Sequence, residues 1–182
     1  MVIWVIGLAG AGKTTIGRKL YQNIKILDSA TVFLDGDHVR DIMGQDLGHS
    51  LEDRKKNGLR VCQLCRYLDR QGVNVVCAIL SLFEEQQCWN RENYSDYFEV
   101  FVDVPMDVLA ARDQKGLYSG AKAGRIRDVA GFDIPFKPPA NSDMIVRNDQ
   151  DLTHVDAIVA AVLDRIAPRL KVSSDAIHIH SA

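Results

Sequence analysis

The sequence predicts an α/β fold in which helices flank a parallel β-sheet. Two observations lead to this prediction. Short apolar runs alternate along the chain with segments of helical period, and the first of these runs passes directly into a glycine-rich turn. Such alternation is typical of parallel strands joined by crossover helices. With 182 residues, of which 47% are hydrophobic, the chain is long enough for a compact core, and we expect a single domain over residues 1–182.

Five apolar runs are expected to be the strands of this sheet. Each is short and rich in β-branched, aliphatic or aromatic residues, which favours a buried strand. The runs are Val2–Ile6, Val32–Leu34, Val73–Leu80, Phe98–Val102 and Met144–Val146.

Three longer segments, Lys13–Asn23, Asp53–Gln71 and Leu152–Leu170, are expected to be helices. Their apolar residues recur at helical spacing, so that each segment presents one face to a core. In Asp53–Gln71, the predicted apolar face consists of Leu59, Cys62, Leu64, Cys65 and Leu68.

The segment from Arg112 to Asn141 interrupts this pattern. It is rich in Gly, Lys, Arg and Pro, and it lacks a sustained apolar period. A long loop inside a small domain is commonly a lid over an active site. Its cations suit closure over phosphates, although a solvated basic loop is the alternative. We therefore expect a mobile lid over about residues 112–141, with cations at Arg112, Lys115, Lys122, Arg125 and Arg127.

The overall charge argues against some classes of partner. A formal net charge of -2 and an isoelectric point near 6.2 provide no basic field for nucleic acid or an anionic membrane. Glycines interrupt the first apolar stretch and no positive flank precedes it, so we expect neither a signal peptide nor a membrane span. Four cysteines are few for a disulfide scaffold, and a reducing cytoplasm is the expected compartment.

Residues Gly7–Thr14 read GLAGAGKT and match the pattern G-x-x-x-x-G-K-[ST] in full. The motif follows a predicted strand and precedes a predicted helix, as its function requires. Glycines allow backbone N–H groups to approach phosphate oxygens closely, and the start of the helix adds its positive dipole end. Lys13 is expected to reach the β- and γ-phosphates, and the Thr14 hydroxyl to ligate Mg²⁺. These features predict a P-loop NTPase-type sheet.

The P-loop alone does not identify the phosphate acceptor, so carboxylates near the loop are informative. Asp35 follows the predicted strand Val32–Leu34, and Asp37 stands two residues later. Two aspartates in this arrangement can serve a magnesium ion and a base that orients an attacking hydroxyl. Asp103 also ends a predicted strand. The pattern by itself does not choose between Asp35 and Asp103.

Longer stretches of the chain resemble the adenylyl-sulfate kinase family, whose members phosphorylate the ribose 3′-hydroxyl of adenylyl sulfate with MgATP. The combination of DGD, RD-x-KGLY and a run of glycine, aspartate and proline is far more specific than the P-loop. The resemblance implies a P-loop kinase domain with ATP and Mg²⁺ as cofactors and a small nucleotide as acceptor. The matching segments are GLAGAGKTT (Gly7–Thr15), LDGDHVR (Leu34–Arg40), DLGHS (Asp46–Ser50), DRKKN (Asp53–Asn57), AILSLF (Ala78–Phe83), FVDVP (Phe101–Pro105), ARDQKGLY, AKAGRI and AGFDIPFKPP.

The resemblance also implies roles for individual residues. Asp35, Asp37 and Lys13 would be catalytic, Thr14 and Asp35 would hold the metal ion, and Asp103 would be structural. The residues implied in ATP binding are Gly7, Gly10, Ala11, Gly12, Lys13, Thr14, Thr15 and Arg112. Those implied in acceptor binding are Arg40, Arg54, Asn57, Ser81, Lys115, Gly116, Leu117, His49 and Val129. Guanidinium groups suit the sulfate and phosphate oxygens of such an acceptor.

Several positions depart from the family pattern. The family motif DGDN ends here in His38, DLGFS contains His49 in place of phenylalanine, and the lid phenylalanine is Val129, with Ala130 in place of the threonine that follows. The two lost aromatic residues are those expected to enclose the adenine of the acceptor, and each aromatic–base stack contributes roughly 1–3 kcal/mol. The phosphate-donor half of the pattern is intact, whereas the acceptor half is altered.

Two acceptors therefore stay open. One is adenylyl sulfate, which is the more common substrate in the family. The other is a different nucleotide, as in the similar cytidine diphosphoramidate kinase of capsule biosynthesis. A third hypothesis is a nucleotide-binding module without catalysis, although such a module would be expected to lose Lys13, Thr14 or the carboxylate pair. A homodimer is also left open.

Overall fold

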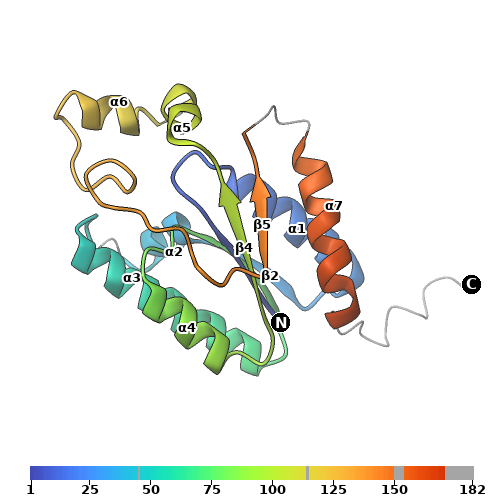
Figure 1. The fold of residues 1–182 in the computed structure, drawn as a ribbon. Helices are drawn as coiled ribbons and strands as arrows, with labels where there is room; N and C mark the ends of the chain where they lie inside the picture. Colours follow the sequence, from blue (N-terminus) through green and yellow to red (C-terminus); the bar gives the residue numbers. More distant parts are fainter. Residues whose placement is uncertain (45, 114, 150–153, 171–182) are drawn as a thin grey trace, which may run out of the picture.

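The computed structural model describes residues 1–44, 46–113, 115–149 and 154–170. Within these residues, five strands form one parallel sheet in the order β2-β3-β1-β4-β5 (Figure 1). The strands are β1 (Val2–Ile6), β2 (Thr31–Asp35), β3 (Asn74–Ile79), β4 (Tyr97–Asp103) and β5 (Met144–Arg147). All five predicted strands are confirmed, with ends that differ by one residue or less.

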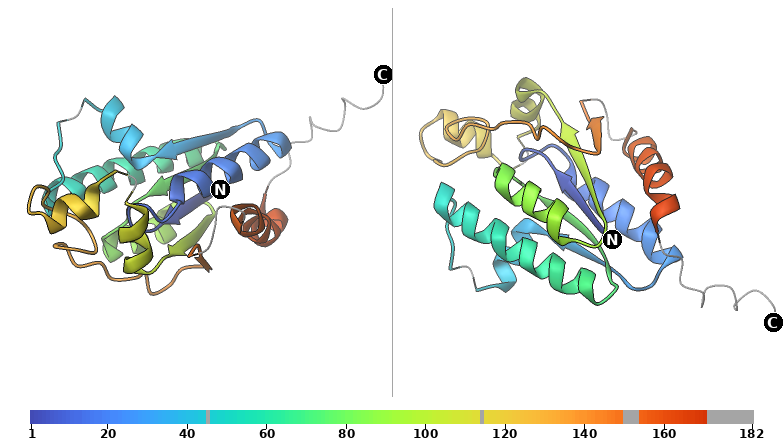
Figure 2. Two further views of the ribbon diagram at one scale, coloured as in Figure 1. Left: turned by 90° about the horizontal axis from the view of Figure 1, so that it is seen from above. Right: turned by 60° about the horizontal axis from the view of Figure 1, so that its bottom comes forward.

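The helices are α1 (Lys13–Leu27), α2 (Gly36–Ile42), α3 (Leu51–Arg70), α4 (Glu84–Asn93), α5 (Met106–Arg112), α6 (Leu117–Lys122) and α7 (Val155–Ile166), followed by the 3₁₀ turn η2 (Ala167–Arg169). Helices α1 and α7 pack on one face of the sheet, and α2, α3 and α4 on the other (Figure 2). The expected start of the last helix, Leu152, lies outside the described residues.

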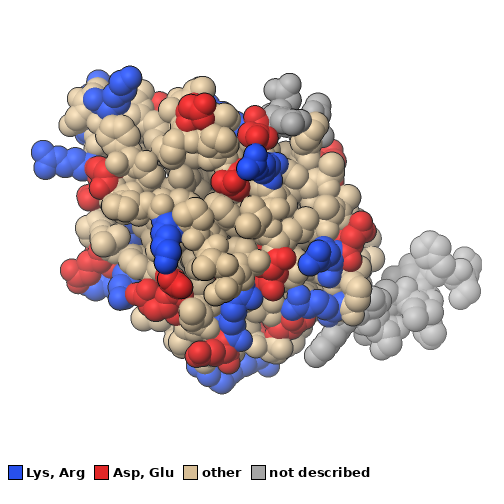
Figure 3. All heavy atoms as spheres, in the orientation of Figure 1, with Lys and Arg blue, Asp and Glu red and all other residues tan. Residues whose placement is uncertain are grey.

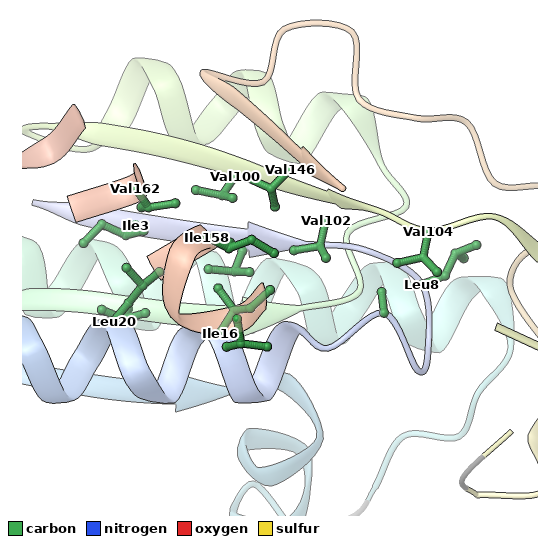
Figure 4. Packing of buried hydrophobic residues seen from close by; sticks show 14 of the residues in the cluster. Ile3, Leu8, Ile16, Leu20, Val100, Val102, Val104, Val146, Ile158 and Val162 are labelled. Carbon is green, nitrogen blue, oxygen red and sulfur yellow. The ribbon is translucent and has the colours of Figure 1, made fainter. Parts of the chain in front are cut away.

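The first face of the sheet carries the larger core cluster (Figure 4). Side chains from β1 and β4 interdigitate there with the buried faces of α1 and α7, and most of them are fully shielded from solvent. Because α1 is fixed against the sheet along its length, the loop between β1 and α1 is held at both of its ends. Residues in this contact include Ile3, Ile16, Leu20, Val100, Val102, Ile158 and Val162.

The second face shows where the expected apolar stripe of α3 was wrong. Cys62 and Cys65 are buried and Leu64 and Leu68 are partly buried against the core, but Leu59 is 49% exposed. The buried side of α3 passes instead through Gly58 and Val61. The buried face of α3 is centred on Gly58, Val61, Cys62 and Cys65, and at about 100° per residue Leu59 falls outside this face.

The predicted lid contains more regular structure than expected, because α6 lies within it. Asp113 explains the start of this helix: its two carboxylate oxygens accept hydrogen bonds from the backbone N–H groups of Tyr118 (2.8 Å) and Ser119 (3.0 Å). At the other end, Asp143 accepts hydrogen bonds from Arg91 of α4 (3.0 Å) and from the N–H of Glu99 in β4 (2.8 Å). Asp113 thus organises the start of the lid internally, and Asp143 ties the chain after the lid to α4 and β4.

One face of the molecule shows how its charged side chains are distributed. On the face seen in Figure 3, acidic and basic side chains are interspersed. Among the described residues, no helix combines the length and the apolar composition that a membrane crossing requires.

Candidate active site

One large cleft, with a volume of about 1320 Å³, lies at the end of the sheet where β1 and β2 terminate. The carboxyl ends of parallel strands are the usual position of a ligand in an open α/β sheet. The cleft is lined by the P-loop, α2, the start of α3, the lid and the residues after β5. Predicted site residues that line it are Gly10, Gly12, Lys13, Thr14, Thr15, Asp35, Asp37, Arg40, His49, Arg54, Asn57, Arg112, Lys115 and Leu117.

The P-loop connects β1 to α1 through a turn that depends on glycine. Gly10 and Gly12 have φ values of 79° and 95°, a left-handed region that other residues rarely adopt. At Gly7, a Cβ atom would lie only 2.8 Å from the carbonyl oxygen of Val102. Gly12 is the N-cap residue of α1, so the N–H groups at the helix start face the cleft region. Gly7 and Ala11 support this loop but do not line the cleft.

Lys13 lies at the first position of α1, and its ammonium group donates a hydrogen bond of 2.8 Å to the carbonyl oxygen of Leu8. Burial lowers the pKa of Lys13 to about 8, although the nearby carboxylates of Asp37 and Asp35 oppose this shift. The ammonium group of Lys13 is therefore poorly hydrated. Such a cation gains much from an anion placed beside it.

Asp35 has two structural partners, one for each carboxylate oxygen. Oδ2 accepts a hydrogen bond of 2.6 Å from the Thr14 hydroxyl, and Oδ1 accepts one of 3.0 Å from the N–H of Asp37. The second bond makes Asp35 the N-cap of α2, which explains why the helix begins at Gly36. The structure thus brings the P-loop threonine and the first carboxylate together.

Asp37 lies in the first turn of α2, and its carboxylate forms an ion pair of 3.1 Å with Lys115 of the lid. Burial raises the pKa of Asp37, but the hydrogen bond from Lys115 and the charges of Lys115, Lys13 and Arg40 outweigh it and lower the pKa below its usual value. Asp37 is therefore held in the ionised form. The second carboxylate thus connects α2 to the lid.

Arg40 and Arg54 line the other half of the cleft, together with His49. Arg40 donates a hydrogen bond of 3.0 Å to the carbonyl oxygen of Leu47, and a second bond to that of Gly48. Arg54 donates to the carbonyl oxygens of His49 (2.8 Å) and Asp128 (2.7 Å). These bonds connect α2, α3 and the lid around one cationic region.

The charge of this region affects its own members. Burial lowers the pKa of Arg54, and the neighbouring charge of Arg40 lowers it further. Although His49 is exposed at the cleft, its partial desolvation there lowers the pKa of its imidazole, and the charges of Arg40 and Arg54 lower it further, so the imidazole is neutral near pH 7. Asn57 is 5% exposed, and within the described residues its side-chain oxygen has no hydrogen-bond partner. The region therefore offers cations to the anionic groups of a ligand, and an acceptor oxygen to a ligand donor.

The structure does not bring Val129 into the cleft, contrary to expectation. Its side chain is 1% exposed and packs in the larger core cluster. A tight turn causes this orientation, because the Val129 carbonyl accepts hydrogen bonds from the N–H groups of Phe132, Asp133 and Ile134. The next residue, Ala130, lines the cleft instead. Val129 and His49 thus do not face one another across the cleft.

Two further predicted acceptor residues, Ser81 and Gly116, also lie outside the lining. Ser81 is buried, and its hydroxyl accepts a hydrogen bond of 3.3 Å from Gln87. Gly116 is the N-cap residue of α6 with a φ of 61°, a position that favours glycine. In this structure, both residues support neighbouring elements.

Sequence reasoning missed two residues that contact the P-loop. The hydroxyl of Tyr118 donates a hydrogen bond of 2.9 Å to the carbonyl oxygen of Ala9, and Asn148 donates one of 2.8 Å to that of Ala11. Tyr118 belongs to the KGLY segment, so its motif was a usable signal. Asn148 follows β5 and is 137 residues from Ala11 in sequence, and no local pattern marks it.

A P-loop, a carboxylate pair at the end of a second strand and a cationic region, all around one cleft, define a kinase of the P-loop class. Such an enzyme transfers a phosphoryl group from ATP to a hydroxyl group of a small molecule. The comparisons with known proteins narrow this class. The chain belongs to the adenylyl-sulfate kinase family, because the family model described as "Adenylylsulphate kinase" matches residues 1–147.

Several known proteins are similar over most of the chain. The adenylyl-sulfate kinase of Gloeothece citriformis is 39% identical over 166 residues, which are 91% of this chain and 93% of the relative. The cytidine diphosphoramidate kinase of Campylobacter jejuni is 37% identical over 147 residues, 81% of this chain and 85% of the relative. A longer relative, the bifunctional enzyme CysN/CysC of Xylella fastidiosa, is 40% identical over 82% of this chain, and the match spans 24% of that enzyme.

Among solved structures, the APS kinase CysC of Mycobacterium tuberculosis in complex with AMPPNP and APS has a TM-score of 0.81. Its sequence is 31% identical, and the match covers 91% of this chain and 96% of that one. The parallel sheet and its flanking helices therefore have the predicted P-loop kinase fold.

Proposed function

We propose that this protein transfers the γ-phosphate of ATP to the ribose 3′-hydroxyl of adenylyl sulfate. The observation that best supports this proposal is the hydrogen bond of 2.6 Å between Thr14 and Asp35. It joins the P-loop, where the donor phosphates would bind, to the α2 region that carries Asp37 and Arg40 on the acceptor side. A donor site and an acceptor site thus share one cleft, as in-line transfer requires.

On the donor side, backbone N–H groups around Gly12 and the ammonium group of Lys13 would bind the β- and γ-phosphates. Arg112 is positioned to help, because it already donates hydrogen bonds to the carbonyl oxygens of Asn148 (2.7 Å) and Gly10 (3.5 Å). Lys13 would exchange its bond to Leu8 for phosphate oxygens. The lowered pKa of Lys13 is consistent with a site that is completed by an anion.

The residues present also fit a magnesium ion. Mg²⁺ prefers oxygen ligands and is commonly held by one or two protein side chains together with phosphates and water. Thr14 and Asp35 supply such oxygens, and among the described residues no cluster of three or more His, Cys, Asp or Glu side chains offers a larger cage. When bound, Mg²⁺ neutralises charge on the phosphate oxygens.

At the reaction centre, Asp37 would accept the proton of the acceptor hydroxyl as that oxygen bonds to the γ-phosphorus. The bond from the γ-phosphorus to the oxygen bridging to the β-phosphate breaks, and ADP leaves. Lys115 keeps Asp37 ionised and so able to act as a base. Lys13 would stay with the phosphates and stabilise the charge that develops during transfer.

On the acceptor side, Arg40 and Arg54 would bind the sulfate and phosphate oxygens of the acceptor. Asn57 supplies a buried side-chain oxygen without a partner among the described residues, which a ligand donor can satisfy. The lid residues Lys115 and Leu117 line the same cleft. Together these groups match a small dianionic nucleotide.

A second acceptor is favoured by one specific observation. The side chain of His49 lies at the position expected for an aromatic stacking face, and Val129 is turned into the core, so that Ala130 lines the cleft. A site without these two aromatic faces holds a purine less firmly. Cytidine diphosphoramidate is therefore the alternative acceptor. The cytidine diphosphoramidate kinase of Campylobacter jejuni is 37% identical to this chain.

The deciding experiment is a coupled assay of ADP formation with MgATP and each acceptor in turn. The proposal predicts a kcat/KM with adenylyl sulfate that is well above that with cytidine diphosphoramidate. The reverse ranking would establish the alternative. No ADP formation with either acceptor, despite ATP binding, would favour a non-catalytic module. Lys13→Ala is the control for contaminating kinases.

The setting of the reaction is part of the same proposal. We place it in the cytoplasm, with nucleotides rather than nucleic acid or membrane as partners, in a single domain over residues 1–182. The cysteines support a reducing compartment, because Cys62, Cys65 and Cys77 are buried free thiols and Cys88 is an exposed one. Light scattering on a size-exclusion column would distinguish a monomer from a homodimer.

A further inference from the structure

Asn148 forms an unusual connection between the end of the sheet and the P-loop. It follows β5, it is 4% exposed, and its side-chain amide donates a hydrogen bond of 2.8 Å to the carbonyl oxygen of Ala11. Ala11 is itself 1% exposed, so this bond is shielded from water. The backbone N–H of Asn148 donates to the carbonyl oxygen of Asp103 at the end of β4 (3.2 Å). The amide is therefore held in a fixed position.

The bond to Ala11 controls the orientation of one peptide group. The carbonyl oxygen of Ala11 and the N–H of Gly12 belong to the same planar trans peptide, so they point in opposite directions. Because Asn148 holds the carbonyl on the side of β5, the Gly12 N–H must point to the other side. Gly12 is the N-cap residue of α1, where N–H groups lack partners within the helix and are suited to bind an anion.

The packing at Gly12 supports this connection independently. A Cβ atom at Gly12 would lie 2.5 Å from the side-chain nitrogen of Asn148, closer than non-bonded atoms approach. The side chain of Asn148 thus fills the space that any larger residue at position 12 would need. The second glycine of the P-loop motif and Asn148 fit together as one unit.

A third contact extends the unit to the lid. The carbonyl oxygen of Asn148 accepts a hydrogen bond of 2.7 Å from Arg112, the residue at the end of α5 from which the lid starts. Arg112 also reaches the carbonyl oxygen of Gly10 at 3.5 Å. Asn148 therefore contacts the P-loop through its side chain and the base of the lid through its backbone.

We propose that Asn148 is a positioning residue for ATP: its amide holds the Ala11 carbonyl away from the cleft and so directs the Gly12 N–H at the nucleotide phosphates. This inference rests on the proposed function, because it assumes that the P-loop binds ATP. Without the amide, the Ala11–Gly12 peptide is free to rotate, and rotation would turn a carbonyl oxygen toward the phosphates. Phosphate affinity would then fall although no phosphate contact of Asn148 itself is lost.

Two substitutions and two probes test this role. Asn148→Ala removes the amide, and Asn148→Asp keeps its shape but places a carboxylate oxygen against the Ala11 carbonyl. The probes are MgAMPPNP and inorganic tripolyphosphate with Mg²⁺, whose dissociation constants are measured by titration calorimetry. Asn74→Ala is the matched control, since Asn74 is also 4% exposed and its amide donates a bond of 2.8 Å to Asp28, at the opposite end of the sheet.

We expect Asn148→Ala to raise the Kd of both probes by about tenfold, the usual effect of one lost hydrogen bond, and Asn148→Asp to raise it further. At saturating ATP, the turnover of Asn148→Ala should come close to the wild-type kcat, because the substitution leaves the reacting groups unchanged. Asn74→Ala should lower the melting temperature and leave both Kd values within about twofold. If Asn148→Ala does not fold, the isosteric Asn148→Asp supplies the measurement.

Other outcomes overturn the inference. Unchanged Kd values in Asn148 variants with a lowered melting temperature would make Asn148 a purely structural residue. An effect on AMPPNP without one on tripolyphosphate would assign Asn148 to the base or ribose. In either outcome, turnover by the wild-type protein would leave the proposed function intact. A wild-type protein that binds neither probe would refute the proposed function and the role of Asn148 together.

Discussion

The hydroxyl group of Thr14 donates a hydrogen bond of 2.6 Å to the carboxylate of Asp35. Thr14 lies in the first turn of α1, after the P-loop that follows β1, and Asp35 is the last residue of β2; β1 and β2 are separated in the sheet by β3. Their oxygens therefore meet across the cleft and not through neighbouring strands. This contact joins the phosphate-binding loop to the carboxylate pair.

Asp35→Asn should raise the Mg²⁺ concentration needed for half-maximal rate and lower turnover by about 10²-fold or more, because an amide is a weaker magnesium ligand than a carboxylate. The measurement is the initial rate against Mg²⁺ concentration at fixed ATP. Asp103→Asn is the control, since Asp103 also ends a strand but does not line the cleft. A larger loss in Asp103→Asn would assign the magnesium-binding carboxylate to Asp103 and not to Asp35.

Asp37→Asn should lower kcat by about 10²-fold while AMPPNP still binds, because the substitution removes the base and keeps the side-chain shape. Asp37 has a lowered pKa through its bond to Lys115, so it loses its charge only below the usual range of a carboxyl group. Lys115→Ala should therefore shift the acidic limb of the kcat profile to higher pH. An acidic limb that stays in place would exclude Asp37 as the base.

The pKa of Lys13, lowered by burial to about 8, predicts proton uptake when nucleotide binds. Phosphates raise this pKa, so the complex holds a proton that the ligand-free protein has partly lost above pH 8. Affinity for MgADP should thus be highest below pH 8 and fall as the pH rises through that value. Proton uptake is measured directly by titration calorimetry at about pH 8.5, slightly above this pKa, in buffers of different ionisation enthalpy.

The same experiment on Lys13→Ala should show no uptake and a strongly reduced rate, by about 10²–10³-fold, with an unchanged circular dichroism spectrum. Lys19→Ala is a matched control on the same helix, because Lys19 forms a partly exposed ion pair with Asp156 away from the cleft. Uptake that persists in Lys13→Ala would assign the titration to another group.

The lid should be protected from protease when ligands bind. Lys122, Arg125 and Arg127 are exposed in this structure, and trypsin should cleave there more slowly in the presence of MgADP and acceptor, since phosphates neutralise the lid cations. In the Arg54→Ala variant, trypsin should cleave the lid faster without ligand, because the hydrogen bond of 2.7 Å from Arg54 to the Asp128 carbonyl oxygen is lost. Equal rates with and without ligand would contradict a closing lid.

Val129→Phe should destabilise the protein by roughly 1–3 kcal/mol, because it adds volume to a well-packed core. His49→Phe should have little effect on stability, since His49 is exposed at the cleft, and it should lower the KM for adenylyl sulfate if that is the acceptor. Thermal melting and KM measurements on both variants separate these effects. A stable Val129→Phe with an improved KM would mean that Val129 faces the acceptor after all.

The sequence by itself determined the features that depend on local order along the chain. A strand, a glycine-rich turn and a helix start must follow one another for the P-loop to form, so Gly7–Thr14 could be recognised without a structure. Strand positions were equally readable, because residues buried on both faces of a sheet are apolar in continuous runs. The short helices α2 and α6 were missed. Asp35 caps α2, and Asp113 accepts hydrogen bonds from the N–H groups at the start of α6, and such single contacts leave little periodic signal.

Only the tertiary structure decided which distant residues meet. Asp35 and Asp103 look alike by their place at a strand end, and in the sequence only the family resemblance separated them. The structure adds the contact of Asp35 with Thr14, which depends on strand order, and no local pattern encodes strand order. The inward turn of Val129 follows from hydrogen bonds of its own turn, and the contact of Asn148 with Ala11 spans 137 residues. Such contacts are set by how the sheet and helices pack, since packing minimises exposed apolar surface over the whole chain and not within one segment.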